Sequence, residues 1–184
     1  MNVLRRPVRL ALHVLAVSAC AGRQPAASST GNDREVAAGI ERLRAATRPF
    51  RVLDSAVAAG YAREVADCLV HEHHGAMGYH HSNRAYADAR VEVERPEILL
   101  YERLADGTYR LNGVEYIVPY RAWPRDSVAP VVMGQQLKRE NNLQIWYLHV
   151  WAWTENADGV FADFHPGVSC PSGTGKIFRP SGGS

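Results

Sequence analysis

The chain is poor in cysteine, and it contains neither a long apolar run nor a visible internal repeat. Three cysteines in 184 residues exclude a small, disulfide-dense scaffold. The apolar stretch Leu10–Val17 is too short to cross a bilayer as a mature helix, which takes about 20 residues. The absence of a repeat gives no support to a repeat protein.

Clustered basic residues are also missing from the body of the chain. The formal net charge is +2, but the three arginines among residues 1–19 account for this excess. Without those residues Lys+Arg falls from 21 to 18 against 19 Asp+Glu, which gives a net charge of −1. A nucleic-acid partner is therefore not expected, because such a surface gathers Lys and Arg on the folded domain.

What is present at the N-terminus has the layout of a secretory signal. Arginines come first, the apolar stretch Leu10–Val17 follows, and small residues precede Cys20. The run Val17–Cys20 resembles the lipobox of bacterial lipoproteins, in which the cysteine becomes the lipidated first residue. This predicts an exported protein that acyl chains anchor to a bacterial membrane, facing the periplasm or the exterior. The alternative is an ordinary signal peptide that happens to end in cysteine.

The rest of the chain divides by composition. We expect a signal peptide over 1–19, a lipidated Cys20 with a flexible tether over 20–32, one globular domain over 33–171 and a flexible tail over 172–184. Two cysteines, Cys68 and Cys170, remain in the expected domain. In an oxidising compartment an even pair of this kind is expected to form a disulfide.

The hydrophobic patterns predict helices first and strands later. Apolar residues recur at helical spacing over 33–46, and Pro49 begins a second helical segment that Gly60 can end. Two strand patterns, 98–104 and 109–118, flank an Asp-Gly turn and indicate a hairpin. The predicted fold is therefore α+β, a helical pair followed by a mostly antiparallel sheet.

Three further segments have less regular patterns. Residues 68–96 hold five of the eight histidines and few aliphatic residues, which favours a long ordered loop, with a short helix near 84–88 as the alternative. The run 143–153 is apolar on both faces and predicts a central strand covered on both sides. Residues 160–164 follow a turn and predict a final strand.

A series of short motifs resembles a family of small, uncharacterised bacterial exported proteins and lipoproteins. The motifs are Gly-Ala-Met-Gly-Tyr-His at 75–80, Pro-Glu-Ile-Leu-Leu-Tyr at 96–101, Val-Glu-Tyr at 114–116, Leu-His-Val-Trp-Ala-Trp at 148–153, and the segment from 159 to Cys170. The resemblance spans about residues 45–170 and implies no established activity. It carries over to His80, Glu97, Glu115, His149, Cys68 and Cys170. His165 departs from the family pattern, which has Asn there, and His71, His73, His74 and His81 are additions.

Two titratable residues stand inside apolar strand patterns. His149 lies in the middle of 143–153, and Glu115 lies between Val114 and Tyr116. Buried polar groups of this kind need partners, so we expect the two to meet, with His80 supplied by the glycine-bearing segment before them. Two histidines and one glutamate form a metal site with an open position. The alternative is a His–Glu hydrogen bond within the core. Glu97 and His165 are further candidate ligands.

Other familiar motifs fail on spacing. The run His-Glu-His-His at 71–74 has Gly75 where the zinc-protease helix motif needs its second histidine. It is interpreted either as a solvated polar loop or as an exposed copper or zinc ligand set. The run 172–176 lacks phosphate-loop spacing, and Ile177 follows its lysine. No serine lies on a Gly-x-Ser-x-Gly turn.

Three functional classes follow from these patterns. The first is a protein that binds or handles a divalent transition metal, namely zinc, copper or iron, through His80, Glu115 and His149. The second is a metal-dependent enzyme acting on a small molecule. The third is a non-catalytic envelope protein, structural or interacting with partners, in which the His–Glu cluster supports the core.

Overall fold

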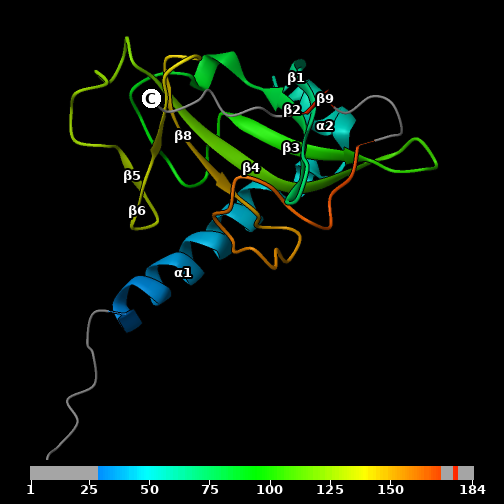
Figure 1. Ribbon diagram of the computed structural model, residues 1–184, viewed down its shortest axis with the longest axis horizontal. Helices are drawn as coiled ribbons and strands as arrows, with labels where there is room; N and C mark the ends of the chain where they lie inside the picture. The colour runs from blue at the N-terminus through cyan, green and yellow to red at the C-terminus, as the bar shows by residue number, and fades with distance from the viewer. Residues whose placement is uncertain (1–28, 171–175, 178–184) are drawn as a thin grey trace, which may run out of the picture.

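Two helical segments pack on one face of a curled, mostly antiparallel sheet (Figure 1). The computed structural model describes residues 29–170 and 176–177. The expected signal peptide, Cys20 and residues 20–28 of the expected tether lie outside the described residues. The α+β class and the single domain predicted from the sequence are confirmed.

The helical part begins with α1, Ser29–Thr47, which starts inside the segment expected as a tether. A 3₁₀ turn, η1 (Arg48–Arg51), and a short helix, α2 (Leu53–Ala58), follow it. The second helical segment is therefore shorter and less regular than the first. Gly60 comes just after it with φ of +100°, a conformation that suits glycine at a helix end.

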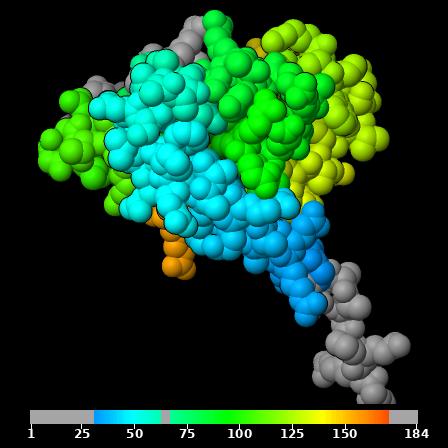
Figure 2. Space-filling view, turned by 180° about the vertical axis from the view of Figure 1, so that it is seen from behind, coloured from blue at the N-terminus to red at the C-terminus, as the bar shows by residue number. Residues whose placement is uncertain are grey.

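Side-chain contacts fix these helical segments on the sheet. Leu43 of α1 is buried in the main hydrophobic core. The indole Nε1 of Trp153 donates to Thr47 Oγ1 at 3.0 Å, and Arg44 Nε donates to the carbonyl of Ala152 at 2.6 Å. In the space-filling view, α1 and the segment after it lie together along one side of the molecule (Figure 2). Among the described residues, no helix combines the length and apolar character needed to cross a bilayer.

Seven strands of the described chain form the sheet in the order β7-β8-β4-β3-β2-β1-β9. All neighbours are antiparallel except β1 and β9. The strands are β1 (Arg63–His71), β2 (Gly75–Ser82), β3 (Ile98–Arg103), β4 (Tyr109–Pro119), β7 (Lys138–Glu140), β8 (Ile145–Val150) and β9 (Lys176–Ile177). A separate hairpin contains β5 (Val131–Val132) and β6 (Gln135–Gln136). The β3–β4 hairpin turns at Gly107, as predicted.

The prediction of a long loop over 68–96 is wrong for its first half. Residues 68–82 belong mostly to the antiparallel pair β1–β2, and only 83–97 are irregular, with one 3₁₀ turn, η2 (Arg84–Tyr86). Local composition is a weak guide here, because pairing with β3 supplies backbone hydrogen bonds whatever the side chains prefer. At Gly78 an added Cβ would lie 2.5 Å from the carbonyl oxygen of Tyr101, so the glycine permits this close pairing.

Two other strand predictions need correction. The apolar run at 143–153 is a strand only over Ile145–Val150, and it lies second from one edge of the sheet. Residues 160–164 form no strand. The backbone around this segment makes separate hydrogen bonds instead of a strand ladder. Trp151 N donates to the carbonyl of Val160 at 2.9 Å, and Ala76 and His165 form an isolated bridge. These contacts satisfy the polar backbone without a regular ladder.

The two faces of the sheet differ in what covers them. On the helical face, Tyr116 of β4 and Leu148 of β8 belong to the main core. On the other face, the C-terminal segment 162–170 covers part of the sheet, and its Val168 packs with Leu100 and Trp151. The Cys68–Cys170 disulfide, with Cα atoms 5.7 Å apart, ties this segment to β1, as predicted. Lys176–Ile177, from the expected flexible tail, extend the sheet as β9.

Candidate metal centre

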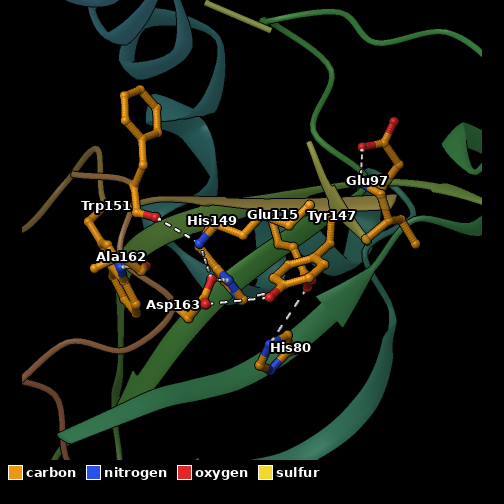
Figure 3. Close-up of polar contacts among 11 residues, drawn as sticks. His80, Glu97, Glu115, Tyr147, His149, Trp151, Ala162 and Asp163 are labelled. Carbon is orange, nitrogen blue, oxygen red and sulfur yellow. Dashed lines mark hydrogen bonds and ion pairs between the residues drawn. The ribbon is translucent and has the colours of Figure 1, made fainter. Parts of the chain in front are cut away.

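His80, Glu115 and His149 converge on the face of the sheet away from the helices (Figure 3). They come from β2, β4 and β8, and Glu115 lies directly opposite His149 in the antiparallel register. One ligand atom from each side chain lies within 4.8 Å of the others. The three residues are 5%, 7% and 2% exposed, so the group is buried. This group of residues can hold a metal ion.

The distances within the group exceed those of hydrogen bonds. Nε2 of His80 lies 3.7 Å from Oε2 of Glu115, and Nε2 of His149 lies 3.9 Å from Oε1. Hydrogen bonds between such atoms span about 2.7–3.2 Å. Ligands about 2.0–2.1 Å from a tetrahedral ion lie roughly 3.3–3.4 Å apart, which is closer to the observed spacing. Both ring nitrogens of His149 are buried without a hydrogen-bond partner. The two contacts are therefore too long for a closed hydrogen-bonded cluster and leave room for a metal ion.

The protonation states also suit a cation. Burial, together with His149 and His81, lowers the pKa of His80 to about 3, so its imidazole is neutral and its lone pair is free to bind. Burial raises the pKa of Glu115, although His149 opposes this shift. A bound cation would favour the ionised carboxylate and offset the cost of burying it.

Asp163 adds a carboxylate that the sequence reasoning did not assign to the site. Its Oδ1 lies 3.7 Å from Nδ1 of His149 and accepts a hydrogen bond from Lys138 Nζ at 2.6 Å. Tyr147 OH donates to its other oxygen at 3.4 Å. The His149 contact is longer than a hydrogen bond. Even so, against the raising effect of burial, His149 and Lys138 together lower the pKa of Asp163 to about 2.

The position of Asp163 matches a common feature of metal sites. A histidine that binds a metal usually directs its other ring nitrogen at a carboxylate, which fixes the tautomer and the ring orientation. Here Asp163 faces Nδ1 of His149, while Nε2 faces Glu115. In the sequence, Asp163 precedes His165 by two residues, but no local pattern indicates that it faces His149.

Glu97 and His165, the two further candidates, contribute no ligand atom to the three-residue group. Glu97 is buried beside it, and its Oε2 accepts a hydrogen bond from the backbone N–H of Ile117 at 3.0 Å. Burial raises the pKa of this carboxyl to about 8. In His165, Nδ1 accepts from the N–H of Gly167 at 2.9 Å, and the ring packs edge-on against Trp151.

The histidine-rich run 71–74 forms the exposed turn between β1 and β2 and is also separate from the group. Nδ1 of His74 lies 3.3 Å from a carboxylate oxygen of Asp158, and both side chains are about half exposed. The side chain of His73 is 74% exposed. Solvation of these side chains agrees with the interpretation as a polar turn.

A pocket of about 400 Å³ lies over the buried group. Its lining includes all three candidate ligands together with Asp163. Most of the other lining side chains are apolar, and they come from the strands, from the irregular segment 83–97, from loop residues including Arg121 and Leu143, and from the C-terminal segment. The site is thus a polar cluster at the wall of an apolar pocket, an arrangement common in small-molecule sites.

Comparisons with family models, curated proteins and solved structures found no match to this chain. The resemblance to exported bacterial proteins stays a prediction.

Proposed function

We propose that this protein is an exported bacterial lipoprotein that binds a divalent transition metal through His80, Glu115 and His149. The observation that carries the proposal is their convergence at distances longer than hydrogen bonds, with unpaired imidazole nitrogens inside the protein. Two neutral imidazoles and one carboxylate form a donor set that suits zinc, copper or non-haem iron. Three protein ligands leave a position open for water or another molecule.

The envelope location is supported by two independent features of the chain. The N-terminal segment has signal and lipobox features that end at Cys20. The Cys68–Cys170 disulfide agrees with an oxidising compartment outside the cytoplasm, where such bonds persist. A lipid anchor at Cys20 would hold the metal-binding domain near a membrane while the domain itself stays in the aqueous phase.

The first alternative, a structural His–Glu cluster without metal, is less well supported. A cluster that stabilises the core needs close hydrogen bonds, because an unpaired buried polar group costs about 1–3 kcal/mol. The His80–Glu115 and His149–Glu115 contacts of 3.7 and 3.9 Å do not supply them.

The second alternative is a metal-dependent enzyme acting on a small molecule. The pocket beside the group supports it, since the open coordination position could face a ligand there. Asp163 and Tyr147, which also line the pocket, are ionisable groups within reach of a reacting molecule. A screen of small molecules with and without chelator separates turnover from binding.

The experiment that tests metal binding is elemental analysis of the purified mature protein after chelation and reloading with Zn²⁺. We expect one tightly held ion per chain. The His149→Ala and Glu115→Gln variants should lose it, whereas His73→Ala, which removes an exposed histidine, should retain it. Circular dichroism of each variant checks that it is folded. Equal metal contents in wild type and His149→Ala would refute the proposal.

A further inference from the structure

The pocket beside the three candidate ligands has a chemistry that narrows the class of molecule it can bind. Its walls are mainly apolar, and part of their side chains come from β2, β4 and β8, the strands that also carry the candidate ligands. The apolar wall residues include Met77, Ile98, Ile117, Ile145, Tyr147 and Phe164. A pocket of about 400 Å³ is within the range of about 300–1,000 Å³ that is usual for small-molecule sites.

The polar groups in the pocket are unevenly distributed. His80, Glu115, His149 and Asp163 gather at one place, where a metal ion would expose its open coordination position. Glu97, which is buried beside this group, already has a partner, because its Oε2 accepts a hydrogen bond from the backbone N–H of Ile117 at 3.0 Å. Away from the metal ligands, an apolar body can therefore pack without leaving a buried charge unpaired.

Other lining residues of the pocket are exposed. Leu143 is 70% exposed although it lines the pocket, which marks an apolar path from the pocket to the solvent. Two arginines, Arg84 and Arg121, line the pocket at exposed positions together with one partly exposed acid, Glu140. At this exposed side of the pocket the two arginines outnumber the one acid, which favours the approach of an anion when an ion is bound at the ligand group.

We propose that the metal-loaded pocket binds a medium-chain monocarboxylate, with its carboxylate on the metal ion and its hydrocarbon chain along the apolar walls toward Leu143. The inference rests on the proposed metal site, because the ion supplies the partner for the buried carboxylate. An oxygen donor suits the open position of a site with two imidazoles and one carboxylate. Charge attracts the head group, and burial of the chain provides selectivity for length.

The test uses the mature protein loaded with Co²⁺, whose visible absorption reports changes among its ligands. Metal content is measured first on every sample. Octanoate, acetate and octan-1-ol are then titrated, and affinities are measured by calorimetry. Octanoate should bind at least about 50-fold more tightly than acetate, because it buries six more methylenes. Both carboxylates should change the Co²⁺ spectrum, whereas octan-1-ol should leave it unchanged.

Two variants locate the hydrocarbon chain. Leu143→Asp, at an exposed position, and Ile145→Asp, deeper in the wall, should weaken octanoate binding by at least about fivefold while the bound Co²⁺ is retained. Val128→Asp is the matched control, since Val128 is 79% exposed and does not line the pocket. Should Ile145→Asp fail to fold, Leu143→Asp alone decides the point.

The outcomes separate this inference from the metal proposal. Bound Co²⁺ with equal affinities for octanoate and acetate would overturn the ligand class and leave metal binding intact. Octanoate binding without any change in the Co²⁺ spectrum would overturn the placement of the carboxylate. A protein that takes up no metal would refute both proposals.

Discussion

Glu115 and His149 face each other across the antiparallel pair β4–β8, with Oε1 and Nε2 3.9 Å apart. Directly opposed residues of two strands project to the same face of the sheet, so the register itself brings them together. Both side chains are buried, and neither completes a hydrogen bond with the other. Under the proposed function, a cation between them would account for the pairing of an acid and an imidazole at this separation.

Asp163→Asn should weaken metal binding without removing any proposed ligand. The amide cannot provide the negative charge that faces Nδ1 of His149, and loss of such an outer carboxylate typically costs about 10–100-fold in metal affinity. Competition with a chelator of known affinity measures the change. Asp158→Asn is the control, because Asp158 contacts the exposed His74 instead. An unchanged affinity in Asp163→Asn would argue against its role in orienting His149.

Glu97 should make the metal-free protein less stable as the pH rises. Its pKa is raised by burial from 4.5 to about 8, so the folded state holds the proton more tightly than the unfolded chain. This contribution is present below about pH 4.5, declines as the pH rises and is lost above about pH 8. Since one pKa unit corresponds to about 1.4 kcal/mol, the effect amounts to several kcal/mol.

Denaturant unfolding with a chelator present, at several values of pH, measures this dependence. Glu97→Gln keeps the volume of the side chain but does not titrate, so its stability relative to the wild type should increase with pH. Glu72→Gln, at an exposed position, should follow the wild type. A constant difference between Glu97→Gln and the wild type across this range would show that Glu97 titrates normally.

Loss of the Cys68–Cys170 disulfide should destabilise the domain and loosen the segment that carries Asp163. The bond closes a loop of 102 residues, for which the chain-entropy model gives about 4–5 kcal/mol as an upper estimate. Without the disulfide, Glu102 would still hold the segment 162–170 in part, because its Oε1 accepts two hydrogen bonds from Ser169. Unfolding of the Cys68→Ser/Cys170→Ser double variant measures the loss. Two reactive thiols at these positions in the denatured wild type would disprove the bond itself.

The anchor is predicted to depend on Cys20. Cys20→Ser removes the thiol that would accept the lipid, so the protein should be soluble or remain unprocessed. Metabolic labelling with a fatty acid, followed by fractionation of membranes, measures both properties. His73→Ala, a substitution in the domain, should label normally. Lipid labelling of the Cys20→Ser protein equal to that of the wild type would exclude this anchor.

The sequence predicted the site from an inconsistency in two strands. His149 and Glu115 lie inside strongly apolar runs, where polar side chains need partners. This requirement predicted that the two residues contact each other and His80. Asp163 was not predicted as part of the site, because residues 160–164 have the pattern of a strand but do not form one. Its place beside His149 depends on the path of 162–170 across the sheet, which the disulfide and individual backbone bonds determine.

The difference between local patterns and long-range contacts also explains which parts of the fold were predicted wrongly. The helices and the β3–β4 hairpin depend on local periodicity and turn residues, which single segments contain. The strands β1 and β2 have weak local patterns and form through strand pairing. Besides each other, β2 pairs with β3, and β1 pairs with β9, which is distant from it in the sequence. Positive φ at Gly75 and Gly78 indicates backbone requirements that composition alone does not reveal.

Metal binding at this site is tested by a crystal structure of the Zn²⁺-loaded protein with anomalous data collected at the zinc edge. We expect one strong anomalous peak about 2.0–2.2 Å from ligand atoms of His80, Glu115 and His149. His149→Ala crystals treated in the same way should lack that peak. An empty site between these three residues in the loaded wild type, or zinc bound only at the exposed turn 71–74, would refute metal binding by His80, Glu115 and His149.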